Sequence, residues 1–133
     1  MKDELTNMTT SILARGKGFN EECYDVWEDG KSWRLSYYMG DGTGVIKNQE
    51  IKQGICTENA MCTNPTQSLL QRWLREKHNW HVEIFLDAYM NYCISFSKIG
   101  PFEALDRGVG VLCSTYEEAL EIALFNILKR FIN

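Results

Sequence analysis

Two neighbouring segments of alternating apolar and polar residues constrain the fold of this chain more than any other feature. Their apolar positions are, in order, Trp80, Val82, Ile84 and Leu86, then Tyr92, Ile94 and Phe96. Alternation with a period of two is typical of strands that bury one face. Residues 87–91 would form the turn of an antiparallel hairpin, and the apolar stretch at 109–112 predicts a third, shorter strand.

A helix is predicted immediately before these strands. Asn64 is its candidate N-cap, Pro65 suits the first helical position, and Gln67 completes a capping box. Its expected buried stripe consists of Leu69, Leu70, Trp73 and Leu74. We expect this helix to end at Asn79.

A second helix is predicted after the strands, from about Tyr116 to Phe131. Thr115 and Glu118 form another capping box at its start. Its apolar face consists of Ala119, Leu120, Ala123, Leu124, Ile127, Leu128 and Phe131. A face of this width can cover a sheet.

The N-terminal half has weaker signals. Residues 3–15 predict a helix, and residues 23–38 predict a hairpin because an Asp29-Gly30 pair lies between aromatic-rich runs. The stripe expected to be buried on this helix consists of Leu5, Met8, Ile12 and Leu13. Residues 39–64 are scattered with glycine and predict a long loop with room for one short strand; a linker between two domains is the competing interpretation.

Together these patterns predict an α+β fold. We expect one antiparallel sheet, made of the hairpin plus the three-stranded meander, with helices on one face. The 133 residues are expected to form a single domain spanning 1–133, because two autonomous cores would each be marginal. A hydrophobic share of 44% favours a globular chain over a disordered one.

Cysteine usage and the N-terminus predict a cytoplasmic protein. The first five residues include Asp3 and Glu4, which do not suit a signal peptide, and no apolar run is long enough to cross a membrane. The odd number of cysteines, five, favours free thiols. The formal net charge of −4 disfavours non-specific nucleic-acid binding.

No catalytic or cofactor motif is present, so the sequence predicts a non-enzymatic protein without a cofactor. The glycine-rich residues 40–44 lack the Lys-Ser/Thr pair of a phosphate-binding loop, and no G-x-S-x-G sequence occurs. Four residues offer a zinc site as the weaker alternative, although their spacing does not fit: Cys56, Cys62, His78 and His81. A Cys-His dyad using Cys56 or Cys62 also stays open.

One helix face is a candidate partner-binding surface. Opposite the Leu/Trp stripe of the helix before the strands lie Ser68, Gln71, Arg72 and Arg75. Such a face could meet an acidic partner protein or nucleic acid, whereas solvated arginines are the commoner use of such a face.

Several segments carry a resemblance that spans the chain. The runs PTQSLLQRWLREKH at 65–78 and TYEEALE at 115–121, with KGF at 17–19, resemble a family of small uncharacterised proteins from phages and mobile elements of gut Bacteroidales. That resemblance implies a mobile-element context and no particular activity.

The C-terminal half carries a second, looser resemblance. Its order of helix, three antiparallel strands and helix is similar to double-stranded-RNA-binding domains, and its TYEEAL junction is similar to HicB-type antitoxins. The sequence departs from the RNA-binding pattern where those domains place lysines, because Glu117 and Glu118 stand there.

The function expected from the sequence is that of a small accessory protein which binds another protein. The alternative is a nucleic-acid-associated or antitoxin-like regulator using Arg72 and Arg75.

Overall fold

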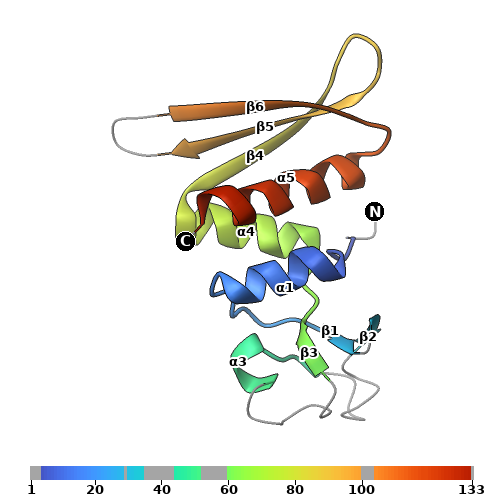
Figure 1. Cartoon of the computed structure of the whole chain (residues 1–133), viewed down its shortest axis with the longest axis vertical. Coiled ribbons are helices and arrows are strands. Elements are labelled where there is room, and N and C mark those ends of the chain that lie inside the picture. The colour runs from blue at the N-terminus through green and yellow to red at the C-terminus, as the bar shows by residue number, and fades with distance from the viewer. Residues whose placement is uncertain (1–3, 29, 35–43, 52–59, 100–103, 133) are drawn as a thin grey trace. The chain divides into compact units, whose positions relative to one another are not determined.

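The computed structural model describes residues 4–28, 30–34, 44–51, 60–99 and 104–132, and it confirms a mixed α+β architecture (Figure 1). Its residues group into two compact units. The first consists of Met1–Glu4 and Gln67–Asn133, and the second of Leu5–Thr66. The single domain spanning 1–133 stays a prediction.

The first unit is a three-stranded antiparallel sheet in the order β4-β5-β6, with two helices packed on it. The strands are β4 (Trp80–Leu86), β5 (Tyr92–Ile99) and β6 (Ala104–Cys113). Trp80 pairs with Lys98 and Leu86 with Tyr92, which confirms the predicted hairpin. The third strand was predicted over 109–112 only. It is longer because its first half, from Ala104, pairs with the end of β5.

Helix α5 (Tyr116–Phe131) covers this sheet and contacts all three strands. The N-cap half of the predicted capping box is confirmed, because Thr115 Oγ1 accepts a hydrogen bond from the Glu118 amide at 3.1 Å. The reciprocal half is not formed, because the Glu118 carboxylate accepts from the Ser114 hydroxyl at 3.3 Å. Its buried residues are Ala119, Leu120, Ala123, Leu124, Ile127 and Leu128. At its end, the Phe131 ring lies 4.7 Å from the Trp80 ring and 5.7 Å from the Phe96 ring, measured between centroids. The predicted apolar face is therefore the face that packs on the sheet.

Helix α4 (Gln67–His78) packs against β4 and α5. It ends as predicted, since Asn79 adopts a positive φ of 60° and its amide bonds to the Arg75 carbonyl. The predicted start was wrong: Asn64 does not cap this helix, and Pro65 is not in it. Gln67 does not close a capping box either, because its side-chain amide donates to the Glu117 carbonyl at 2.9 Å.

The second unit contains another antiparallel sheet, in the order β2-β1-β3. Its strands are β1 (Asp25–Glu28), β2 (Lys31–Arg34) and β3 (Ala60–Thr63). Gly30 has a φ of 78°, as the predicted hairpin turn requires. The prediction of one continuous sheet was therefore wrong, because the hairpin pairs with β3 instead of the C-terminal meander. The expected loop at 39–64 contains β3 and the short helix α3 (Asn48–Ile51), while 39–43 and 52–59 lie outside the described residues.

Helix α1 (Met8–Gly16) starts later than the predicted residue 3, because the Asn7 side chain caps it. Its expected buried stripe was also wrong. Leu5 and Ile12 are each 37% exposed, whereas the buried residues of the helix are Thr10, Ser11 and Ala14. The polar side of the helix turns inward. The Ser11 hydroxyl finds hydrogen-bond partners there, whereas the Thr10 hydroxyl is buried without one among the described residues.

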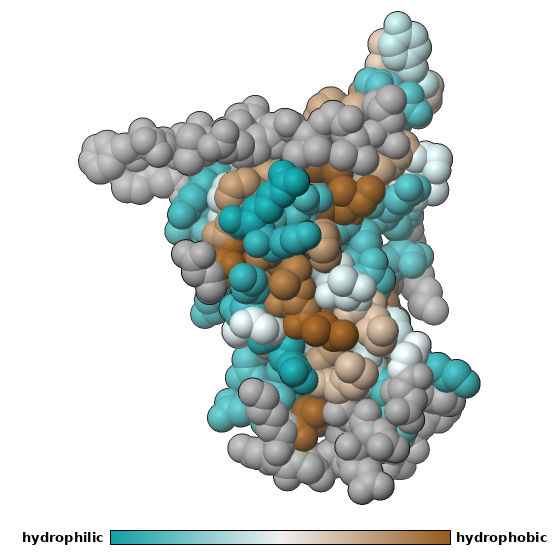
Figure 2. Space-filling model, viewed as in Figure 1, coloured by the Kyte–Doolittle hydropathy of each residue, from teal (hydrophilic) through white to brown (hydrophobic). Residues whose placement is uncertain are grey.

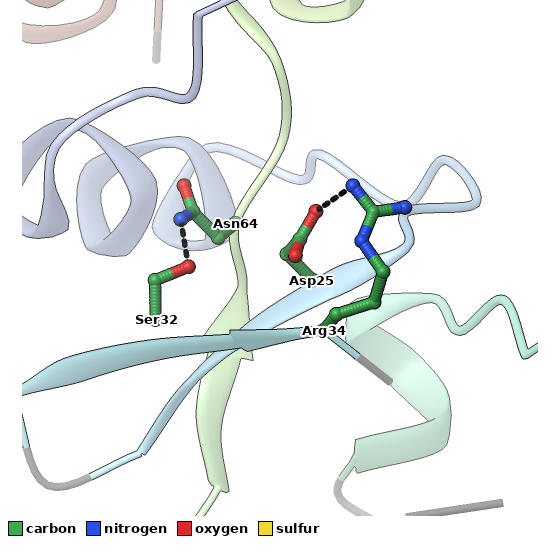
Figure 3. A network of polar contacts seen from close by, with 4 residues as sticks. All are labelled: Asp25, Ser32, Arg34 and Asn64. Atoms are coloured by element: carbon green, nitrogen blue, oxygen red, sulfur yellow. Dashed lines mark hydrogen bonds and ion pairs between the residues drawn. The ribbon is translucent and has the colours of Figure 1, made fainter. Parts of the chain in front are cut away.

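Those partners centre on Asn64, which is buried between α1 and the sheet of the second unit. Its Oδ1 accepts hydrogen bonds from the Thr6 and Ser11 hydroxyls, each at 3.3 Å. Its Nδ2 donates to Ser32 Oγ at 2.6 Å, and an Arg34–Asp25 ion pair lies nearby (Figure 3). Burial of an amide is tolerated only when its polar atoms are paired. Asn64 is thus a structural residue of this unit.

We expect Leu124→Ala to destabilise the chain by about 2–5 kcal/mol, because it opens a cavity where α5 meets the sheet. The exposed Arg130→Ala on the same helix should change the free energy of unfolding by less than about 1 kcal/mol. Urea unfolding followed by circular dichroism measures both. Equal shifts of the two midpoints would show that α5 is not held by this face.

Candidate functional site

The turn between β4 and β5 is the most distinctive surface of the first unit. It projects from the sheet beyond the two helices, as Figures 1 and 2 show. Large apolar side chains are exposed at this turn and at the end of β4. Their exposed fractions are 49% for Phe85, 46% for Leu86, 86% for Tyr89 and 72% for Met90. We call these four residues the hairpin tip.

The backbone of the hairpin tip is held by Asp87. The Asp87 amide donates to the Asn91 carbonyl at 2.9 Å, and the Met90 amide donates to the Asp87 carbonyl at 3.2 Å. One carboxylate oxygen of Asp87 accepts from the amides of Tyr89 at 2.8 Å and Asn91 at 3.0 Å. Met90 has a positive φ of 66°. Two exposed apolar side chains are therefore presented by a closed, hydrogen-bonded turn.

Asp87 is ionised at neutral pH because these bonds stabilise its charged form. Hydrogen bonding from the Asn91 amide, followed by that from Tyr89, holds the pKa of the Asp87 carboxyl below its ordinary value. An ionised carboxylate accepts both amide hydrogen bonds, whereas the protonated acid is a weaker acceptor.

Acidic and aromatic groups surround the tip. The Tyr116 ring, 39% exposed, meets the Tyr92 ring edge-on at 6.2 Å, which places the start of α5 beside the β4–β5 turn. Glu118 in the first turn of α5 and Glu83 on β4 are exposed. Among the described residues, no Lys or Arg lies in the turn or in the first turn of α5. The hairpin tip is thus apolar at its centre and acidic at its margin.

The predicted partner-binding face on α4 is only partly exposed. Gln71 is half-buried, and its side-chain amide donates to the Val82 carbonyl at 3.3 Å, so it ties α4 to β4. Ser68, Arg72 and Arg75 are exposed. The two arginines therefore stay available to an acidic ligand, and Gln71 has a structural role.

The four candidate zinc ligands are placed as follows. Cys62 is buried in β3 of the second unit, and burial raises the pKa of its thiol to about 11. His78 and His81 belong to the first unit; His81 Nε2 lies 3.5 Å from a Glu83 carboxylate oxygen. Cys56 lies outside the described residues. Across the described part of the chain, no three metal-binding side chains gather in one place.

The described thiols lack the features of a catalytic nucleophile. Burial raises the pKa of Cys23 to about 12, and it also raises the pKa of Cys113 above its ordinary value. The pKa of the Cys93 thiol is raised by desolvation and by the neighbouring Asp87 carboxylate. A reactive cysteine needs the opposite shift, toward the thiolate. Free thiols therefore remain the expectation for these cysteines. None of the described helices is long and apolar enough to cross a membrane.

Sequence reasoning treated residues 87–91 only as a turn and missed Tyr89 and Met90. A signal was present, because turns favour Gly, Asn, Asp, Ser and Pro for backbone reasons. Tyr and Met supply no such conformational preference, so their place at a turn indicates another use.

We expect the hairpin tip to loosen in acid because Asp87 loses its charge. Since its folded pKa is depressed, its contribution to stability is present above the unfolded pKa and is lost as pH falls through the lower folded pKa. In an NMR titration, the amide signals of Tyr89 and Asn91 should shift together with a midpoint below about 3.9, the ordinary value of an aspartate. A midpoint at or above that value would show that the carboxylate does not hold the turn.

Comparison of the chain with protein-family models, with curated proteins and with solved structures gives no match.

Proposed function

We propose that the chain is a small non-enzymatic accessory protein that binds another protein through its hairpin tip. The observation that carries this proposal is the exposure of Tyr89 and Met90, 86% and 72%, on a turn closed by hydrogen bonds. Aromatic residues and Met are enriched in protein interfaces, and aromatic anchors contribute much of the binding energy. A preformed turn also loses less conformational entropy when it binds.

The shape and charge of the tip define the partner. A projecting apolar tip fits a concave apolar pocket, and the acidic margin formed by Glu83, Asp87 and Glu118 favours basic groups around that pocket. The partner we propose is a protein with an apolar pocket bordered by Lys or Arg. The mobile-element context implied by the sequence resemblance agrees with an accessory role of this kind.

The alternative function, a nucleic-acid-associated or HicB-like regulator, is favoured by a different observation. Arg72 and Arg75 are exposed on α4, and the first unit follows the helix, three strands, helix order of double-stranded-RNA-binding domains. Against the RNA-binding pattern, the first turn of α5 carries Glu117 and Glu118. Any phosphate contact must then lie away from that turn.

A photoreactive phenylalanine analogue in place of Tyr89 tests the proposed function in the cells that naturally produce the chain. We expect one main cross-linked product with a different protein, and addition of Phe85→Ser should reduce its yield at least about tenfold by removing an anchor. These substitutions change exposed residues, so the free energy of unfolding should change by less than about 0.5 kcal/mol.

The matched control carries the same analogue at Tyr24, which is 56% exposed in the second unit. It should not give the same product. A product of twice the chain mass from position 89 would indicate self-association and contradict the proposal. Equal yields from both positions, or no loss with Phe85→Ser, would contradict it as well.

A further inference from the structure

Both helices of the first unit end at the same side of the sheet, opposite the hairpin tip (Figure 1). Helix α4 ends at His78, two residues before Trp80, and the Phe131 ring at the end of α5 lies 4.7 Å from the Trp80 ring. Lys98 on β5 pairs directly with Trp80. The ends of α4 and α5 and the paired ends of β4 and β5 therefore meet around Trp80.

Basic side chains collect at this place. The exposed cations are Arg75, Lys77, Lys98, Lys129 and Arg130. The lowered pKa of His78, due first to burial and then to the Lys98 ammonium, agrees with a positive local potential. Within the described part of the chain, none of the five is in an ion pair. We call these five residues the basic end.

The positive charge at the basic end exceeds what the helices need. Each helix C-terminus carries about half a negative charge, so two helices offset about one positive charge. The exposed Glu76 offsets another. Among the described side chains at the basic end, about three positive charges therefore remain uncompensated, although the chain as a whole has a formal net charge of −4.

We propose that the basic end binds the phosphate backbone of nucleic acid. Among the side chains that the structure describes at the basic end, cations are exposed and large apolar residues are not, which favours this ligand over an acidic protein. The described large apolar residues that are exposed in the first unit are Phe85, Leu86, Tyr89, Met90 and Tyr116, all at the opposite end. A protein interface needs such anchors at its centre, whereas phosphate contacts need only cations. Arg75 and Arg130 can also bind phosphate oxygens through two hydrogen bonds each.

The test uses a fluorescein-labelled 20-base-pair DNA duplex and the full chain, with binding followed by fluorescence anisotropy at about 25–200 mM salt. About three phosphate contacts, one for each uncompensated cation, would give a log–log slope near −2.7. We expect Lys129→Glu combined with Arg130→Glu to weaken binding at least about tenfold at the lowest salt. The double variant Arg75→Gln with Lys98→Gln, which removes charge without reversing it, should also weaken DNA binding. This variant leaves the end of α5 unchanged.

The matched control is Lys17→Glu combined with Lys31→Glu in the second unit, which changes the net charge by the same amount. It should bind within about twofold of the parent chain if contact is local. Equal weakening by the control, or no salt-dependent binding by the parent chain, overturns the proposal. Because the hairpin tip is unchanged in every variant, cross-linking from position 89 reports separately on protein binding.

Discussion

The packing of α5 on the β4-β5-β6 sheet is the interaction on which both candidate surfaces depend. Leu124, Ile127 and Leu128 are fully buried on one face of this helix. Burial of a side chain of this size contributes about 1.5–3 kcal/mol, so the helix is held mainly by this face. Its first turn is thereby placed beside Tyr92, which follows the hairpin tip in β5, and its last residues are placed beside Trp80.

One consequence is that the exposed apolar side chains and the exposed cations lie at opposite ends of the first unit. The hairpin tip is apolar with acidic groups around it, whereas the exposed side chains that the structure describes at the basic end are cations. Part of this arrangement stabilises the helices, because acidic side chains interact favourably with the N-terminus of a helix and basic side chains with its C-terminus. The surplus of cations at the basic end and the exposed Tyr89 and Met90 are not explained by stability. For this reason we propose a protein partner for the hairpin tip and nucleic acid for the basic end.

The parts of the fold that the sequence predicted well are those with strong local signals. The period-two pattern of 80–86 and the Thr115 N-cap determine their elements through nearby residues alone, and the strand and the N-cap were confirmed. The predicted burial of Leu86 was wrong, because the end of β4 extends into the exposed hairpin tip. Asn64 was wrongly predicted to cap α4, because the capping pattern considers only neighbouring residues. Its actual partners, Thr6 and Ser32, are distant in sequence. The same network draws the polar side of α1 inward. As a result Ile12 on the helix, and Leu5 just before it, are partly exposed and not buried as predicted.

The candidate surfaces were harder to predict than the fold. Arg75 could be placed on an exposed helix face from its spacing, but its grouping with Lys98 and Lys129 requires knowledge of which element ends meet. The tip required the three-dimensional placement of the β4–β5 turn, which projects beyond α4 and α5 and leaves Tyr89 and Met90 exposed (Figure 1).

The proposed binding role requires the turn at the hairpin tip to be preformed and rigid in the free protein. Backbone order parameters from ¹⁵N relaxation at residues 87–91 measure this rigidity. We expect values near 0.85, close to those of the flanking strands β4 and β5. Values below about 0.6 at Tyr89 and Met90 would show a flexible loop and contradict the claim.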